Sequence, residues 1–197
     1  LAPHCYEKIS FGDRDEGVLA TAEPPAATLA ELVPKRAGIV AVLDGIEKPG
    51  NLGAILRTAD AAGVAAVLVT TPGTDLFNPN TIRASLGTVF SVPLAQATVA
   101  EAAAWLAARD CRVYAARVDA ERDYTAVDYT PGAAVILGSE ALGISSDWDA
   151  VPGRAAGQQL VEPICLPMLG EADSLNVSAT AAVLFYEALR QRTATPQ

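Results

Sequence analysis

Three continuous apolar runs place the strongest limit on how this chain can fold. Residues 39–43, 65–69 and 133–137 are each five residues long and contain no polar side chain. A strand with one face in water alternates apolar and polar residues, whereas a continuous run indicates a strand that is covered on both faces. Strands of that kind are typical of parallel sheets whose two faces carry helices. The runs therefore predict an α/β fold.

Helical patterns lie between these runs, as a parallel sheet requires. Residues 51–62 repeat apolar side chains at helical spacing, and residues 176–192 form a long last helix. Thr98 and Glu101 form a capping-box signature at the start of another helix. Strands and helices that alternate in this way predict one parallel sheet with helices on both faces. The remaining elements are expected at 80–86 (a short helix) and at 89–92, 112–116 and 161–166 (strands).

The beginning of the chain lacks this alternation. Residues 1–36 form an approach segment, in which a short strand at 18–20 and a helical turn at 29–33 are expected, with two prolines between them. The sequence starts at Leu1 rather than at methionine, so we expect that residues precede it in the natural protein. We therefore interpret residues 37–197 as the main domain.

Charge and cysteine content narrow the possible functions. The net charge is −9 and the pI about 4.5, which argues against a large basic surface for nucleic acid. Cys5, Cys111 and Cys165 form no CxxC pair and His4 is the only histidine, so neither a metal site nor a disulfide framework is expected. The apolar runs are far too short to span a bilayer, and no signal segment opens the chain. These features predict a reduced, cytoplasmic protein without a membrane partner.

Polar segments that contain glycine follow three of the expected strands. They cover residues 44–59, 137–145 and 166–178. Ligands of open α/β sheets bind beyond the carboxyl ends of the strands, and these segments lie at those ends. None of them has the glycine spacing of a phosphate-binding loop or of a dinucleotide fingerprint. An NAD-dependent enzyme on an ordinary doubly wound sheet is therefore disfavoured.

The polar residues of these segments also admit ordinary structural explanations. Asn51 and Ser174 stand where they would cap the following helices. Arg57 is a charged residue in a helix whose other members are mostly apolar, and Glu140 follows a glycine turn, as many surface glutamates do. Asn176, however, adds another polar group to the start of the last helix, which favours contact with a ligand or substrate.

Together, the segments resemble the signature motifs of SpoU-type methyltransferases of the SPOUT superfamily. The matching stretches are NLGAILRTA (51–59), LGSEALGI (137–144), LPMLG (166–170) and SLNVS (174–178), with a further match at 83–93. All of them occur in the order that the family shows, and the resemblance extends over residues 17–192. The match is therefore specific as a set, although no single motif decides it.

The resemblance implies a parallel α/β sheet whose C-terminal stretch is threaded into a deep trefoil knot, which periodicity alone does not predict. It also implies a homodimer, and the many apolar residues of the last helix agree with this. Family members often carry a small N-terminal RNA-binding domain. Residues 1–36 are therefore interpreted as a linker or remnant of such a domain, and residues 37–197 as a knotted domain that binds S-adenosylmethionine. The missing domain would supply the basic surface that this acidic chain lacks.

The resemblance also assigns the expected site residues, one position at a time. The polar active-site positions of the family fall on Asn51, Arg57, Glu140, Ser174 and Asn176. The cofactor pocket is expected to be lined by Ala115, Leu137, Gly138, Leu166, Met168 and Leu175.

The activity that the resemblance implies is methyl transfer from S-adenosylmethionine to a ribose 2′-hydroxyl in RNA. Arginine stays protonated in proteins and has no acceptor, so Arg57 is expected to stabilise the developing alkoxide or to grip a phosphate rather than act as the base. Ribosomal RNA is the favoured substrate, because the approach segment is similar to the linker of rRNA-modifying members. A tRNA 2′-O-methyltransferase and a non-catalytic RNA-binding protein on the same fold remain alternatives. The modified nucleotide and the acceptor of the hydroxyl proton stay open.

Overall fold

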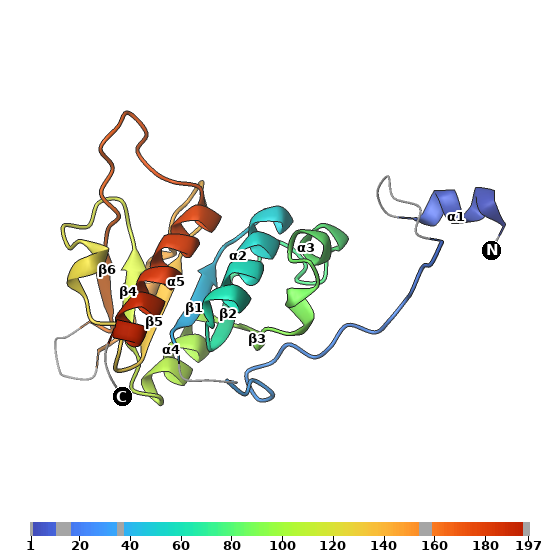
Figure 1. Ribbon diagram of the computed structural model, residues 1–197. Helices are drawn as coiled ribbons and strands as arrows, with labels where there is room; N and C mark the ends of the chain where they lie inside the picture. Colours follow the sequence, from blue (N-terminus) through green and yellow to red (C-terminus); the bar gives the residue numbers. More distant parts are fainter. Residues whose placement is uncertain (1, 11–16, 35–37, 154–158, 195–197) are drawn as a thin grey trace.

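A six-stranded parallel sheet forms the centre of the structure. The computed structural model describes residues 2–10, 17–34, 38–153 and 159–194. Neighbouring strands of the sheet all run parallel, in the order β3-β2-β1-β5-β4-β6 (Figure 1). The parallel α/β fold predicted from the apolar runs is therefore confirmed. The strands are β1 (Val40–Asp44), β2 (Ala66–Thr70), β3 (Leu94–Ala97), β4 (Arg112–Ala116), β5 (Ala133–Leu137) and β6 (Val161–Ile164).

Helices connect most of the strands and lie close to their predicted positions. The three longest expected helices are present, and the capping box of Thr98 and Glu101 is formed at the start of α4. Figure 1 shows α1 apart from the sheet. The helices are α1 (Pro3–Ile9), α2 (Pro49–Ala62), α3 (Pro79–Ala84), α4 (Val99–Ala107) and α5 (Val177–Ala194), with 3-10 turns η1 (Thr88–Phe90), η2 (Tyr124–Ala126) and η3 (Ser146–Trp148).

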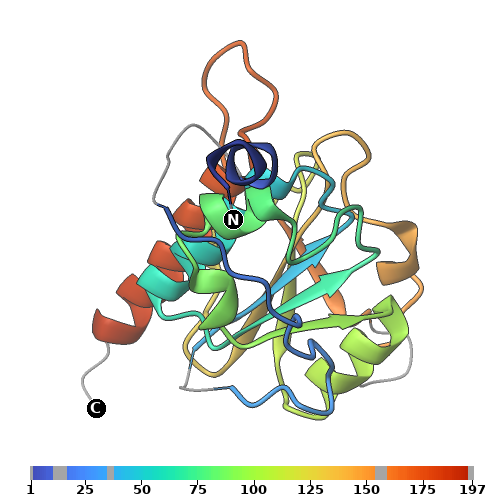
Figure 2. The same cartoon turned by 90° about the vertical axis from the view of Figure 1, so that its right-hand side faces the viewer.

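Both faces of the sheet are covered, as the continuous apolar runs require. Along β1, Ala41 and Leu43 face one core, which contains the buried residues of α2 and α5. The alternate residues Val40 and Val42 face a second core, which contains the buried residues of α4 together with Trp148. Figure 2 shows α2 and α5 on one side of the sheet and α4 on the other. Both faces of each central strand are therefore buried, one in each core.

The predicted strand at 89–92 is wrong, because the chain turns there. Leu86 and Gly87 adopt positive φ angles of 51° and 84°, which reverse the chain before η1. The hydroxyl of Thr88 donates to the carbonyl of Ser85 and stabilises this turn. The edge strand β3 begins only at Leu94, after Pro93. The sequence indicated a strand at 89–92 because most of these residues are apolar, as they would be in a strand.

The approach segment also differs from expectation. Residues 18–20 form no strand, because no other strand lies beside them, and Val18 is 78% exposed. Instead, the chain first joins the sheet at Ala27, whose carbonyl accepts a hydrogen bond from the Gln96 amide of β3 at 2.9 Å. The predicted turn at 29–33 is present, and its Leu32 is buried.

The chain crosses the sheet between β6 and α5, and this return creates the functional end of the molecule. β6 lies at the edge of the sheet beside β4, whereas α5 packs against α2 and β5. Residues 165–176 therefore pass beyond the carboxyl ends of the strands, where Figure 1 shows them rising above the sheet. Among the described residues, no helix has both the length and the hydropathy that a bilayer span needs.

The contact between α2 and α3 leaves no space for a side chain at Gly53. A Cβ atom there would lie 2.6 Å from the Cβ of Ala84 and 2.6 Å from the carbonyl oxygen of Thr81. Since backbone cannot yield easily, we expect Gly53→Ala to lower the free energy of unfolding by about 1–3 kcal/mol. Chemical denaturation measures this change.

Gly50 provides the matched control, since it lies in the same helix with nothing within 4 Å of a built Cβ. Gly50→Ala is expected to be neutral or slightly stabilising, because alanine lowers the entropy of the unfolded chain. Equal effects of the two substitutions would contradict the tight contact between the helices.

Candidate active site

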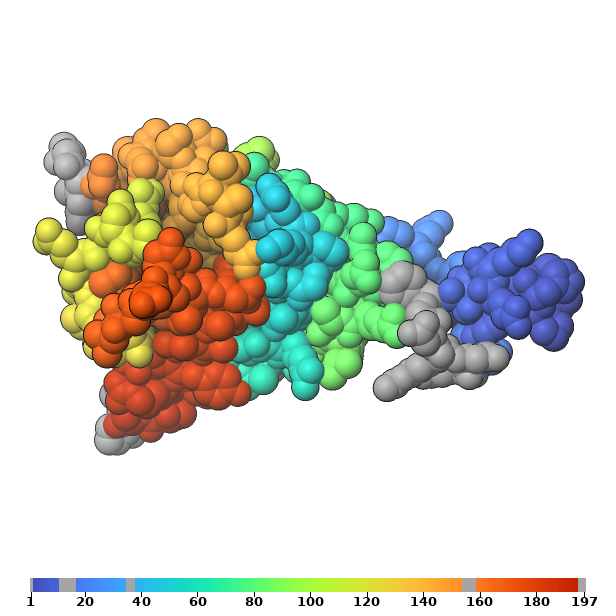
Figure 3. Space-filling view, turned by 90° about the horizontal axis from the view of Figure 1, so that it is seen from above, coloured from blue at the N-terminus to red at the C-terminus, as the bar shows by residue number. Residues whose placement is uncertain are grey.

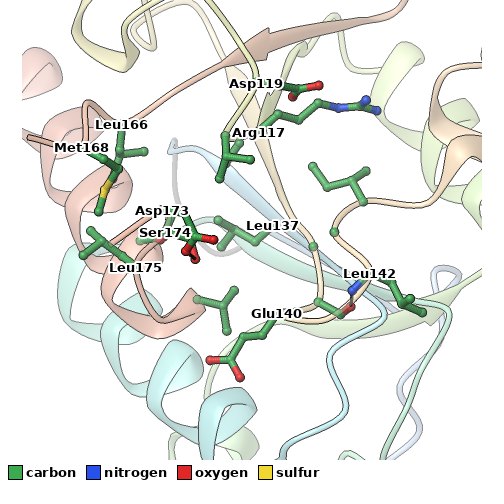
Figure 4. Close-up of a pocket in the computed structure, with 18 residues that line it drawn as sticks. Arg117, Asp119, Leu137, Glu140, Leu142, Leu166, Met168, Asp173, Ser174 and Leu175 are labelled. Atoms are coloured by element: carbon green, nitrogen blue, oxygen red, sulfur yellow. Dashed lines mark hydrogen bonds between the residues drawn. The ribbon is translucent and has the colours of Figure 1, made fainter. Parts of the chain in front are cut away.

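A cavity of about 490 Å³ lies at the carboxyl ends of β4 and β5. Its walls are residues 116–119 after β4, the loop 137–144 after β5, and the segment that returns from β6 to α5 (Figure 4). Figure 3 looks onto this end of the molecule, where these segments and the start of α2 lie next to one another. A volume of this size is typical of small-molecule sites.

Most residues predicted to contact a cofactor line this cavity. Ala115 is the exception, because strand alternation turns its side chain into the core that contains α4, and Ala116 takes its place in the wall. Apolar side chains from two loops thus face a common space, to which Gly138 adds its backbone. The predicted residues in the lining are Leu137, Gly138, Leu166, Met168 and Leu175.

Gly138 is needed for the shape of the loop after β5. A Cβ there would lie 2.3 Å from the carbonyl carbon of Gly143. Ser139 and Gly143 exchange two backbone hydrogen bonds of 3.0 Å, which close the loop on itself. Gly138 therefore allows the two ends of the loop to approach each other closely.

A polar network joins the three sequence motifs beside the cavity. Glu140 Oε1 accepts hydrogen bonds from Asn51 Nδ2 at 3.2 Å and from Asn176 Nδ2 at 2.5 Å. Asn176 Nδ2 also lies 3.3 Å from Asn51 Oδ1. The ammonium of Lys48 forms an ion pair with Glu140 Oε2. Residues far apart in sequence thus converge on one carboxylate.

The environment of Glu140 favours its ionised form. The hydrogen bond from Lys48 is the largest cause that lowers the pKa of this carboxyl, and the charge of Lys48 and the hydrogen bond from Asn51 add to it. Partial desolvation opposes them, but the pKa remains below its usual value. At neutral pH, Glu140 is therefore a hydrogen-bond acceptor and a weak base.

Local helix geometry explains why the two asparagines reach Glu140. α2 begins at Pro49 with Lys48 as its N-cap, so Asn51 does not cap the helix and its amide is free to point outward. At α5, the cap is Asn176 and not Ser174, because Asn176 Oδ1 accepts from the amide of Ser178 at 3.0 Å. This bond directs Asn176 Nδ2 toward Glu140.

The chain matches the model of the SpoU rRNA Methylase family over residues 38–186. It belongs to that family. It is 33% identical over 193 residues to the 23S rRNA (guanosine-2'-O-)-methyltransferase RlmB of Ralstonia nicotianae, covering 95% of this chain and 74% of the relative.

Two further comparisons concern a protein of Streptomyces viridochromogenes. The chain is 30% identical over 194 residues to the 23S rRNA (uridine(2479)-2'-O)-methyltransferase of that organism, covering 93% of this chain and 64% of the relative. It resembles the crystal structure of the SpoU methyltransferase AviRb with the cofactor AdoMet, at a TM-score of 0.77 and 28% identity, covering 88% of this chain and 65% of that one. The chain thus spans slightly less than two thirds of these relatives.

Not all family positions converge in this chain. Ser174 lines the cavity, and its hydroxyl donates to Asp173. Arg57 is exposed and lies outside the cavity lining, six residues beyond Asn51 along α2, or about 9 Å at the usual helical rise. In the described part of the chain, no hydrogen bond or ion pair engages its guanidinium. The SpoU motifs therefore bring together Asn51, Glu140 and Asn176, with Arg57 to one side.

Sequence reasoning missed a buried carboxylate that holds the site together. Asp44 is 1% exposed; its Oδ1 accepts from the hydroxyl of Thr70 at 2.8 Å and its Oδ2 from the amide of Ser145 at 2.7 Å. Lys48 was missed as well. The available signal for Asp44 was an acidic residue at the end of an apolar run, directly before a glycine.

Lys48 controls the pKa of Glu140, and its replacement tests the network directly. Lys48→Met removes both the hydrogen bond and the positive charge, so we expect the pKa of Glu140 to rise toward its ordinary value. Carboxyl-carbon NMR titration measures this change. Lys8→Met removes the same charge from the distant helix α1 and should leave Glu140 unchanged. An unaltered Glu140 pKa in Lys48→Met would contradict the ion pair.

Proposed function

We propose that this chain is the catalytic part of an RNA 2′-O-methyltransferase that uses S-adenosylmethionine and acts on ribosomal RNA. One observation carries the proposal: three SpoU motifs form a polar network on Glu140, and this network borders a cavity at the carboxyl edge of the sheet. The similarity of the chain to 23S rRNA 2′-O-methyltransferases supports the choice of substrate.

The cavity suits this cofactor in size and chemistry. Leu137, Leu166 and Met168 offer apolar contact, and the closed loop at Gly138 offers backbone groups for an adenosine moiety. When bound, the cofactor would supply a methyl group on an already activated sulfonium sulfur. The enzyme's main task is then to align the ribose oxygen and to exclude competing water.

The polar network is suited to orient a ribose rather than to take its proton. Glu140 has a lowered pKa and already accepts bonds from Lys48, Asn51 and Asn176, so its basicity is low. Its role is to fix the two asparagine amides, which offer donors and acceptors to hydroxyl groups. The 2′-hydroxyl proton would then pass to water.

Arg57 would stabilise negative charge next to this network. Its guanidinium carries a permanent charge and is exposed. Among the described residues, no group pairs with this guanidinium, so an RNA phosphate, or the alkoxide that develops on the ribose oxygen, would be its partner. This role needs the planar fork of arginine and not only its charge.

The trefoil knot, the homodimer and a cytoplasmic location belong to the same proposal. The return of residues 165–176 across the strand ends supports the knot, and three free cysteines suit a reducing compartment. Support for the dimer from α5 is smaller than its sequence indicated, because several of its apolar residues are already buried in the core: Val177, Ala181, Leu184, Phe185 and Ala188. The larger apolar residues of α5 that could contact a second subunit are Tyr186, which is 50% exposed, and the half-buried Val183 and Leu189.

Substitutions at Arg57 test the proposed chemistry. We expect Arg57→Ala to lower the methyl-transfer rate by roughly 100- to 1,000-fold, since it removes a donor to developing charge. Arg57→Lys should recover only part of the rate. Affinity for S-adenosylmethionine should stay within about threefold, because Arg57 lies outside the cavity. The measurements are methyl-transfer rates on ribosomal RNA, cofactor calorimetry and thermal melts.

Arg109, on the opposite side of the sheet above Trp105, is the matched control. Arg109→Ala should keep the rate near that of the wild type. A wild-type rate in Arg57→Ala would refute the role of Arg57. If the Arg57→Ala variant instead fails to fold, Arg57 has a structural role.

A further inference from the structure

The ionisable residues that line the cavity do not balance in charge. Two of them are compensated: Arg117 pairs with Asp149 at 2.5 Å, and Glu140 pairs with Lys48. The lining also contains Asp119 and Asp173, and no ion pair joins either to a cation in the described part of the chain. The cavity therefore carries excess negative charge.

Asp173 is the better placed of these two carboxylates. It precedes α5, and Figure 4 shows it beside Ser174, between Leu137 and Leu175. Asp119 lies at the rim next to Arg117 in the same view. Asp119 is thus close to the ion pair of Arg117 and Asp149, whereas Asp173 lies between the apolar side chains of Leu137 and Leu175.

The charge of Asp173 has no evident part in folding. Among the described residues, its Oδ1 accepts only from the hydroxyl of the adjacent Ser174, at 3.2 Å, and the side chain is exposed. In the described residues, its other oxygen is bonded to no group. A carboxylate that faces a cavity without a structural partner is available to a cationic ligand.

We propose that Asp173 makes the cavity select the sulfonium methyl donor over the neutral thioether that remains after transfer. This inference rests on the proposed cofactor. Donor and product differ by one methyl group and one positive charge at sulfur, and are otherwise the same. Apolar contacts distinguish them only by the methyl group, whereas a carboxylate attracts the sulfonium and gains nothing from the thioether. Asp173 thereby favours release of product before the next donor binds.

Calorimetry with S-adenosylmethionine and S-adenosylhomocysteine on Asp173→Asn tests the inference. The amide keeps the size and the hydrogen bond to Ser174 but removes the charge. We expect affinity for the donor to fall about three- to tenfold and affinity for the product to stay unchanged. Raising the salt concentration should reduce the preference for the donor in the wild type and have less effect in the variant.

Two controls separate a local effect from a general one. Asp147→Asn removes the same charge from η3, outside the cavity lining, and should preserve the preference for the donor. Asp119→Asn should have a smaller effect than Asp173→Asn. Thermal melts of all three variants should match the wild type.

The outcomes distinguish this inference from the proposed function. If Asp173→Asn weakens both ligands equally, or if Asp147→Asn changes the preference as strongly, selection by Asp173 is refuted while the cofactor assignment stands. If the wild type binds neither ligand, the proposed function fails and this inference fails with it.

Discussion

One buried carboxylate holds the parts of the site in register. Asp44 ends the central strand β1, binds the Thr70 hydroxyl of the adjacent β2, and accepts the amide of Ser145 from the loop after β5. A buried polar group is costly unless it is hydrogen-bonded, so these two bonds favour this arrangement over one that leaves the carboxyl oxygens without partners. Because α2 starts just after Asp44, the same residue fixes the relation of Asn51 to the loop that carries Glu140.

The site divides binding and orientation between two neighbouring environments. The cavity is mostly apolar, which suits a flat adenosine group. The network around Glu140 is polar and connected to Lys48, which keeps the carboxylate ionised and its basicity low. An arrangement of this kind suits a reaction whose leaving group is already activated, because alignment contributes more than proton abstraction.

Local patterns predicted much of the fold, and the motifs indicated the three residues that converge, Asn51, Glu140 and Asn176. Residues 112–116 and 133–137 coincide with β4 and β5, because buried parallel strands have a distinctive composition. The pattern failed at 89–92, where positive φ angles at Leu86 and Gly87 turn the chain. Gly87 was the available sign of that turn, but the apolar residues after it resembled a strand. Partners such as Lys48 for Glu140 were not predictable, because they depend on how a loop approaches a residue 92 positions away.

The side-chain amide of Asn176 takes part in two structures: the start of the last helix and the polar network. Its oxygen caps α5 by accepting from the amide of Ser178, and its nitrogen donates to Glu140. A side chain that rotates to satisfy one end loses the other, so fraying of the first helical turn and loss of the network are a single cooperative event. Hydrogen exchange at the Ser178 amide is consequently a reporter of the hydrogen-bond network around Glu140, although Ser178 makes no contact with that carboxylate.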